Sequence, residues 1–181
     1  MNHTTKGYTP SVFATLPRLL ERAGRFRDQG SITGLYTVLV DGDDLTEPVA
    51  DSVRSILDGH IVLSRDIASR NHYPAIDVLN SASRVMRDIV PPRHLELAGK
   101  ARSILASYGE AEDLINIGAY ASGSNPQIDF AISKINDLNR FLQQRFDEST
   151  TLKATIENLG VVLSDRKEES PRSKNRRKSD R

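Results

Sequence analysis

The sequence predicts a mixed α/β part that is followed by a small all-α helical bundle and a basic tail. A β-branched, apolar run at Ser31–Val40 lies between segments of helical periodicity, as expected for a sheet that helices cover. Beyond residue 92 only helical periodicity remains. We therefore expect a sheet-containing domain over residues 1–92, a helical domain over residues 93–165 and a disordered tail over residues 166–181.

The first expected element is a helix that begins at Thr9-Pro10. Thr is a favoured N-cap residue, and Pro is well tolerated at the first helical position. One helical face carries the apolar side chains Phe13, Leu16, Leu20 and Ala23. We expect this helix to end at Gly24 and to bend at Pro17, because Pro removes an intrahelical hydrogen bond.

A strand–helix–strand unit is expected next. Ser31–Val40 is apolar on both alternating faces, which predicts a strand that is covered on both sides, as in a parallel sheet. A turn at Asp41–Asp44 leads to a short helix that opens around Thr46 and Pro48. His60–Leu63 predicts a second buried strand, and this order of elements implies a right-handed βαβ crossover.

The second part of the chain is expected to form a bundle of about four helices. Two apolar stripes, Leu97–Leu105 and Leu114–Ile117, predict two helices that end near a small-residue loop at Gly118–Pro126. The apolar positions from residue 127 to residue 142 follow the helical spacing closely. A last helix carries Leu152, Ile156 and Leu159.

Charge is distributed unevenly along the chain. Residues 166–181 contain eight Lys or Arg and three acidic residues, a local charge of +5, so the net charge of +1 leaves −4 for residues 1–165. No residue of the tail could anchor in a core, which predicts disorder. A solvated tail is favoured over an arm for nucleic acid or anionic lipid, because no aromatic residue is interleaved for base stacking.

The composition excludes several classes of site. The chain has no cysteine, so it can form neither disulfides nor thiolate metal sites, and it has no cysteine nucleophile. It contains no run of 18 apolar residues, and Met1–Thr9 lacks the apolar region of a signal peptide. We therefore expect a cytoplasmic protein without a transmembrane segment.

A nucleotide-hydrolysing site needs more than this sequence contains. Such a site uses backbone amides and a Lys around the phosphates, a carboxylate for Mg²⁺, and often an Arg that offsets transition-state charge. The motif Gly-x-x-x-x-Gly-Lys-Ser/Thr is absent from the sequence. The most similar stretch, Gly99-Lys100-Ala101, lacks the upstream Gly and the hydroxyl ligand, and it falls inside a helical stripe.

Two residues are candidates for a partial site, although each also has a structural explanation. Arg84 follows an apolar run that could end a strand, where sites in α/β sheets gather, but it could equally pair with Asp77 or Asp88. Tyr73 could offer a flat face to a purine ring, or it could be an aromatic side chain at the protein surface.

Six ordered blocks of the sequence resemble flagellum-specific and type III secretion ATPases, which are similar to the catalytic subunits of rotary ATP synthases. His72-Tyr73-Pro74-Ala75-Ile76-Asp77 and Asp58-Gly59-His60-Ile61-Val62-Leu63-Ser64-Arg65 are two of these blocks. Ile117-Gly118-Ala119-Tyr120 favours the export branch of this family. The resemblance implies the C-terminal part of a RecA-like P-loop NTPase sheet domain, followed by a helical domain.

The resemblance also implies roles for individual residues. Arg84 matches the arginine finger that reaches from one subunit into the nucleotide site of its neighbour. Tyr73 matches the aromatic residue that stacks on adenine, and Phe146 holds the place of a second adenine-side aromatic in rotary subunits. The loop Ala119–Asp129 matches the region that contacts a central stalk in the rotary relatives. No residue is assigned as a metal ligand.

The family relationship further implies cofactors, partners and location. ATP and Mg²⁺ are the expected cofactors, although their phosphate and metal ligands are not in this chain. The expected partners are other subunits of a homo-hexamer, an export stalk, chaperone–substrate complexes and export gate components, while nucleic acid is not expected. The expected location is cytoplasmic and peripheral to the inner membrane export apparatus.

Three hypotheses of different kinds follow. Because the phosphate loop, the catalytic Glu and the Mg²⁺-binding Asp of the family are absent, we expect that the chain starts mid-domain as the C-terminal part of an export ATPase and is inactive alone. The alternative is a non-catalytic interaction module of the export apparatus, built on the helical domain. A nucleic-acid binder that uses the basic tail is the least favoured hypothesis.

Overall fold

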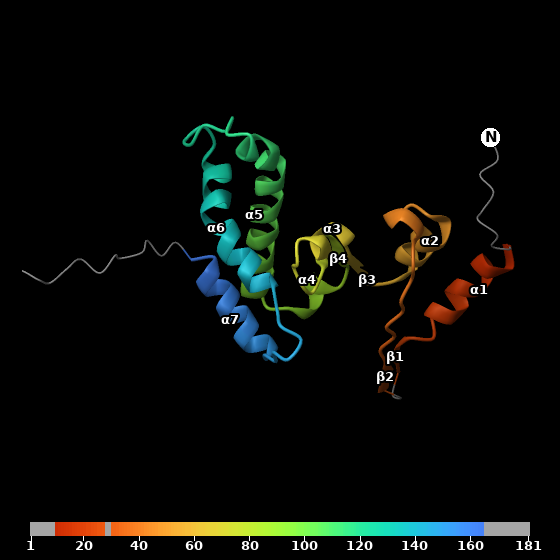
Figure 1. Ribbon diagram of the computed structural model, residues 1–181. Coiled ribbons are helices and arrows are strands. Elements are labelled where there is room, and N and C mark those ends of the chain that lie inside the picture. Colours follow the sequence, from red (N-terminus) through yellow and green to blue (C-terminus); the bar gives the residue numbers. More distant parts are fainter. Residues whose placement is uncertain (1–9, 28–29, 165–181) are drawn as a thin grey trace, which may run out of the picture. The chain divides into compact units, whose positions relative to one another are not determined.

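The computed structural model describes residues 10–27 and 30–164, which form two compact units. The first unit takes the described residues up to Glu96 together with Leu142–Asp147. The second takes Leu97–Phe141 and the described residues from Glu148 onward. Figure 1 labels the elements along the chain. The fold is mixed α/β in the first unit and helical in the second.

Two helices of the first unit confirm the sequence predictions. Helix α1 (Pro10–Leu20) contains Pro17 and ends before Gly24, while Thr9, the expected cap, lies outside the described residues. Helix α2 (Pro48–Ile56) follows the 3₁₀ turn η1 (Asp41–Asp43) at the predicted turn. The two helices contact each other, and their buried apolar side chains are Leu20, Ala50 and Val53.

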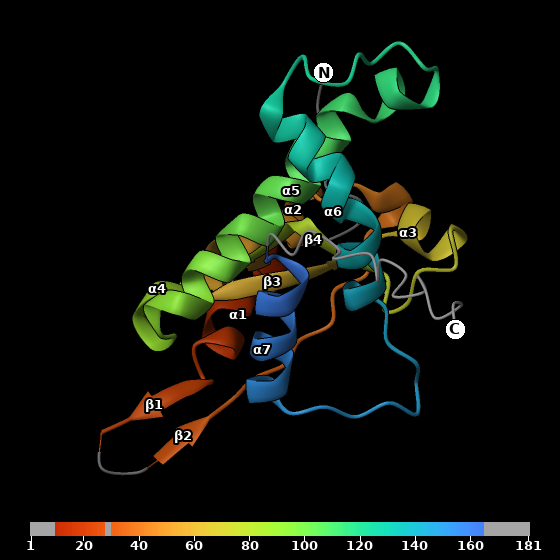
Figure 2. The ribbon, with the colours of Figure 1, turned by 90° about the vertical axis from the view of Figure 1, so that its left-hand side faces the viewer.

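A short hairpin follows α1 that the sequence did not predict. Strand β1 (Gly24–Phe26) pairs in antiparallel fashion with β2 (Gly30–Ile32), and Figure 2 shows the two strands side by side. Gly24 has a φ of 146° and Gly30 a φ of 90°. Such backbone conformations favour glycine, which explains why glycines begin both strands.

The prediction of a buried strand over Ser31–Val40 is wrong for residues 33–40. These residues form no strand, and Leu35 and Leu39 are 93% and 90% exposed. A strand is held by hydrogen bonds to neighbouring strands, and the described part of the chain offers no strand that pairs with this segment. The predicted parallel βαβ unit is therefore also absent there, since both observed sheets are two-stranded and antiparallel.

The second hairpin of the first unit contains the predicted strand at His60–Leu63. Strand β3 (Gly59–Leu63) pairs with β4 (Ile76–Ser83), and the short helix α3 (Arg65–Ser69) lies between them in the chain. The strand is not buried as expected, because Ile61 and Leu63 are 70% and 69% exposed. One face of this two-stranded sheet therefore presents large apolar side chains.

The second unit is built around three helices, which the short helix α4 (Met86–Ile89) precedes in the chain. Helix α5 (Pro92–Asn116) merges the two predicted stripes into one helix, which corrects the expected number of about four. Helices α6 (Pro126–Leu142) and α7 (Leu152–Val162) confirm the other two predictions. Among the described residues, no helix is both long and apolar enough to cross a membrane.

The core of the second unit lies between these helices. Helices α5 and α6 lie next to each other in Figure 1 and cross at an angle in Figure 2. Ala111 on α5 and Ala131 on α6 are almost completely buried. The remaining buried apolar side chains are Ala101, Ile104, Ile135, Leu138, Leu159 and Leu163.

Two lysines fix the carboxyl end of α7. Lys100 Nζ donates to the Leu163 carbonyl at 3.0 Å, and Lys134 Nζ donates to the Ser164 carbonyl. The last carbonyls of a helix lack intrahelical partners and carry partial negative charge, so both contacts are favourable. Lys100 also lies 5.0 Å from the centre of the Phe130 ring, a cation–π distance. Lys100 therefore has a structural role in a helix, not a phosphate-binding one.

Candidate functional site

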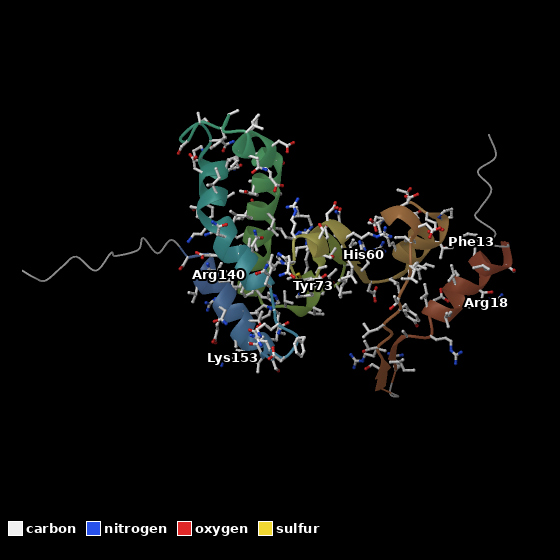
Figure 3. All side chains as sticks on the ribbon, viewed as in Figure 1. Phe13, Arg18, His60, Tyr73, Arg140 and Lys153 are labelled. Carbon is white, nitrogen blue, oxygen red and sulfur yellow. The ribbon has the colours of Figure 1, made fainter. Side chains whose placement is uncertain are left out.

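Tyr73 lies on the surface of the first unit, between α3 and β4. Its side chain is 54% exposed, and Figure 3 labels it. The Tyr73 carbonyl accepts a hydrogen bond of 2.9 Å from the backbone N–H of Gln144. This long-range bond joins the start of β4 to the segment Leu142–Asp147, which belongs to the same compact unit.

Phe146 lies on the segment Leu142–Asp147, which the hydrogen bond from Gln144 joins to Tyr73. The Phe146 side chain is fully exposed. A two-point ion pair flanks it, since Arg145 Nε lies 2.9 Å from Asp147 Oδ1 and Arg145 Nη2 lies 3.0 Å from Asp147 Oδ2. The hydrogen bonds from Arg145 hold the pKa of Asp147 below its ordinary value. The structure thus brings the Tyr73 and Phe146 segments together through the backbone and leaves both rings accessible.

Strand β4 contains a wide bulge that Asp77 organises. His60 pairs with Ala82 and Val62 with Asp77, so Ile61 alone faces the four residues between Asp77 and Ala82. The Asp77 carboxylate accepts the backbone N–H groups of Leu79 and Asn80 at 3.0 and 2.9 Å, and the Asn80 amide at 2.7 Å.

The Ser81 hydroxyl links this bulge to β3 by hydrogen bonds. It donates to the Asp77 carbonyl at 2.5 Å and accepts the Val62 N–H at 3.0 Å. These bonds satisfy backbone groups that the bulge removes from the strand pairing. Bulges redirect the strand that follows them, so this one sets the direction in which the chain leaves β4.

Arg84 follows directly after β4 and is exposed. Its backbone N–H donates to the Asp58 carbonyl at 2.8 Å. Its guanidinium donates to two carbonyls in the last turn of α2, through Nη1 to Ser55 and through Nη2 to Arg54, both at 3.1 Å. The side chain therefore caps the carboxyl end of α2, as basic residues commonly do.

The expected structural explanation for Arg84, an ion pair with Asp77 or Asp88, is wrong. Within residues 10–27 and 30–164, no ion pair joins Arg84 to either carboxylate. Asp77 is instead used by the bulge. Both side-chain partners of Arg84 are neutral carbonyls, so its positive charge is oriented without being neutralised.

Gly59 allows the close approach of β3 to the end of β4. A Cβ atom at this position would lie 2.6 Å from the Ala82 carbonyl oxygen and 3.2 Å from the Ser83 Cα. Sequence reasoning missed the supporting roles of Gly59, Asn80 and Ser81. The Asp-x-x-Asn-Ser spacing was the available signal, because Asp and Asn side chains often bind nearby backbone groups.

The arrangement supplies only parts of a nucleotide site. Tyr73 and Arg84 lie at opposite ends of β4 and do not converge. No group of three side chains that could hold a metal ion occurs in the described part of the chain. The chain therefore exposes an aromatic ring, Tyr73, before β4 and an arginine, Arg84, after it. These two residues do not enclose a phosphate or a metal ion.

Hydrogen bonds to Asp129 hold the loop between α5 and α6. The Asp129 carboxylate accepts the Tyr120 hydroxyl at 3.0 Å and the Gly123 backbone N–H at 3.0 Å. The Asn125 side chain accepts the Gln127 N–H at 2.9 Å and thereby caps the start of α6. The loop that the sequence linked to stalk contact is thus held by its own side chains.

Comparisons with known proteins cover both parts of the chain. Residues 2–83 match the family model of the ATP synthase alpha/beta family, nucleotide-binding domain, and residues 90–160 match that of the T3SS EscN ATPase C-terminal domain. The "Flagellum-specific ATP synthase" of Bacillus subtilis (strain 168) is 57% identical over 153 residues, which are 84% of this chain and 35% of that protein.

Two solved structures of EscN, the ATPase of the enteropathogenic E. coli type III secretion system, also match. The assembled ATPase has a TM-score of 0.83 and 47% identity, over 87% of this chain and 38% of that chain. The complex of the assembled ATPase with its central stalk EscO has a TM-score of 0.78 and 46% identity, over 87% and 37%.

The first part of the chain is thus of the ATP synthase nucleotide-binding class. The chain belongs to the family of flagellum-specific and type III secretion ATPases, and it corresponds to a C-terminal portion of these proteins. This confirms the resemblance and the fold class that the sequence predicted. The chain spans about a third of the length of the relatives it matches.

We predict that Gly59→Ala destabilises the first unit by about 1–3 kcal/mol, because the added methyl group must displace backbone atoms of β4. Gly109→Ala on α5 is the matched control, since its Cβ would meet nothing within 4 Å and alanine favours a helix. Hydrogen exchange of β3 amides measures the effect. Equal exchange in both variants would contradict the proposed close approach.

Proposed function

We propose that this chain forms the C-terminal part of an ATPase that couples ATP hydrolysis to protein export through flagellar or type III secretion systems. Residues 1–92 would complete a nucleotide-binding domain, residues 93–165 would form the C-terminal helical domain, and residues 166–181 would be a basic tail. The exposed Arg84, whose charge is oriented without neutralisation, is the observation that carries this proposal.

Arg84 would act as an arginine finger on the nucleotide of a neighbouring subunit. Such a finger stabilises the charge that develops on the transferred phosphoryl group. An arginine held by a carboxylate would lose much of this ability, whereas one held by neutral carbonyls keeps its full charge. The position of Arg84 at the far end of β4 from Tyr73 supports action on a different nucleotide from the one that Tyr73 contacts.

Tyr73 would stack on the adenine of the nucleotide bound by its own subunit, with Phe146 as a second aromatic at the adenine. Aromatic faces bind purine rings by stacking, and both side chains are accessible. The hydrogen bond between Tyr73 and Gln144 supports a shared location, because it holds the two segments together.

ATP and Mg²⁺ would be the cofactors, and the residues of this chain fit them only in part. The chain offers an aromatic face and an arginine, while the phosphate loop, the catalytic Glu and the metal-binding Asp would come from the remainder of the nucleotide-binding domain. When bound, Mg²⁺ would offset negative charge on the phosphates. A finger that acts between subunits requires an adjacent subunit, and we propose that the subunits assemble as a homo-hexamer.

The proposed partners are an export stalk, chaperone–substrate complexes and export gate components, at a cytoplasmic site peripheral to the inner membrane. The stalk contact would use the loop Ala119–Asp129, which Asp129 holds in a defined shape. This ordered loop also supports the second candidate function. In that alternative the helical domain is a non-catalytic interaction module that binds export components without hydrolysis.

We predict that Arg84→Ala lowers ATP turnover by about 10³-fold in a full-length ring that contains this sequence. Arg140→Ala is the control, since Arg140 is an exposed arginine that pairs with Asp137. Ring assembly, measured by light scattering, should be unchanged for both variants. Turnover of the Arg84→Ala ring near the wild-type value would contradict the finger assignment.

Mixed rings test whether Arg84 acts between subunits. Arg84→Ala subunits should regain turnover when they are mixed with subunits that carry a disabled phosphate loop. This follows because an intact phosphate loop then faces an intact Arg84 from its neighbour. If Arg84 served its own subunit, the mixture would stay inactive.

We also predict that the purified 181-residue chain hydrolyses no ATP, because its sequence lacks the phosphate loop. A phosphate-release assay with Mg·ATP measures this, with the full-length ring as the positive control. Turnover by the purified chain that disappears in the Arg84→Ala variant would contradict the prediction.

A further inference from the structure

Two arginines are arranged in series at the carboxyl end of α2. The Arg84 guanidinium donates through Nη2 to the Arg54 carbonyl and through Nη1 to the Ser55 carbonyl, both at 3.1 Å. The Arg54 guanidinium in turn donates through Nη1 to the Leu45 carbonyl at 3.4 Å. The position of the Arg84 guanidinium therefore depends on the last turn of α2, and the Arg54 side chain ties that turn to the chain ahead of the helix.

The buried residues of α2 lie before the turn that holds Arg84. They are Ala50 and Val53, both of which precede Arg54 in the helix, whereas Ser55 is exposed. Because a helix as short as α2 is marginal by itself in water, its side-chain contacts decide where its end lies. The bond from Arg54 to Leu45 thus adds a fixed point at the end of the helix where buried apolar side chains do not supply one.

The segment that accepts the Arg54 bond is itself held in place. The Asp44 carboxylate accepts the backbone N–H of Thr46 at 2.9 Å and also the Thr46 hydroxyl. The backbone N–H of Leu45 donates to the Asp43 carbonyl at 3.1 Å. The Leu45 carbonyl is therefore a defined anchor for the Arg54 side chain.

The Arg54 side chain is held at a cost to folding. Its Nε is buried and has no hydrogen-bond partner among the residues that the structure describes. A buried donor without a partner opposes folding, so an apolar side chain of similar length would remove this cost. The effect of Arg54 on the stability of the fold can thus be separated from its effect on Arg84. Burial also makes Arg54 unsuited to reach another subunit, whereas Arg84 is exposed.

We propose that Arg54 is a positioning residue for Arg84, which it holds through the last turn of α2 in reach of the nucleotide of a neighbouring subunit. This inference rests on the proposed role of Arg84 as an arginine finger. A displacement of about 1 Å in a catalytic group can lower turnover by about 10²-fold, so the place of the Arg54 and Ser55 carbonyls affects the rate. Adenine binding is not affected, because Tyr73 lies at the other end of β4.

The test replaces Arg54 with Met in a full-length ring that contains this sequence. The kcat for ATP should fall at least about fivefold while KM stays within about twofold, because the loss concerns the finger and not the adenine side. The thermal midpoint should be no lower than that of the unmodified ring, since the variant removes the unpaired Nε. Arg18→Met is the matched control, because Arg18 is an exposed arginine on α1 of the same unit, and it should leave kcat and KM unchanged.

A double variant shows whether Arg54 acts through Arg84. In an Arg84→Ala ring, Arg54→Met should lower kcat no further, since residues that act as a unit are not additive. A fall of the same size in both backgrounds, or a lower thermal midpoint, would assign Arg54 a structural role only and overturn the inference. A loss in Arg84→Ala without a loss in Arg54→Met would reject this inference alone, whereas unchanged turnover in Arg84→Ala would reject the finger assignment as well.

Discussion

The antiparallel pairing of β3 with β4 is the interaction on which the position of every proposed site residue depends. Tyr73 lies just before β4 and Arg84 just after it, so the register of this pairing sets both positions. Gly59 permits the close approach at one end, and the Asp77 carboxylate holds the bulge in the middle. The segment with Phe146 depends on the same hairpin, because Gln144 binds the Tyr73 carbonyl.

The hairpin also determines the electrostatics of Arg84. Its guanidinium donates hydrogen bonds to two carbonyls at the carboxyl end of α2. These carbonyls orient the guanidinium, and because they are neutral they do not cancel its positive charge. A cap of this kind contributes about 0.3–1 kcal/mol at an exposed site, so little free energy opposes release of the side chain toward a phosphate. The capping contact is therefore compatible with the proposed role of Arg84 as an arginine finger.

Local patterns predicted the helices well and the sheet poorly. The spacing of apolar residues located α1, α6 and α7, because a helix satisfies its own backbone hydrogen bonds. The same reasoning failed at residues 33–40, since a strand forms only where a neighbouring strand pairs with it. Arg84 and Tyr73 came from family resemblance. Three other features depend on how distant segments pair in the fold, which a local sequence pattern does not indicate. They are the bulge at Asp77, the close contact at Gly59 and the hydrogen bond of Gln144.

The central claim is that Arg84 serves the nucleotide of a neighbouring subunit while Tyr73 serves its own. The most direct measurement is a structure of the full-length ring with a bound analogue of the phosphoryl-transfer transition state. We predict that the Arg84 guanidinium lies about 3 Å from analogue oxygens held by the adjacent subunit, with Tyr73 stacked on the adenine of its own subunit. An Arg84 that remains on the carbonyls of Arg54 and Ser55, away from every bound analogue, would contradict the account.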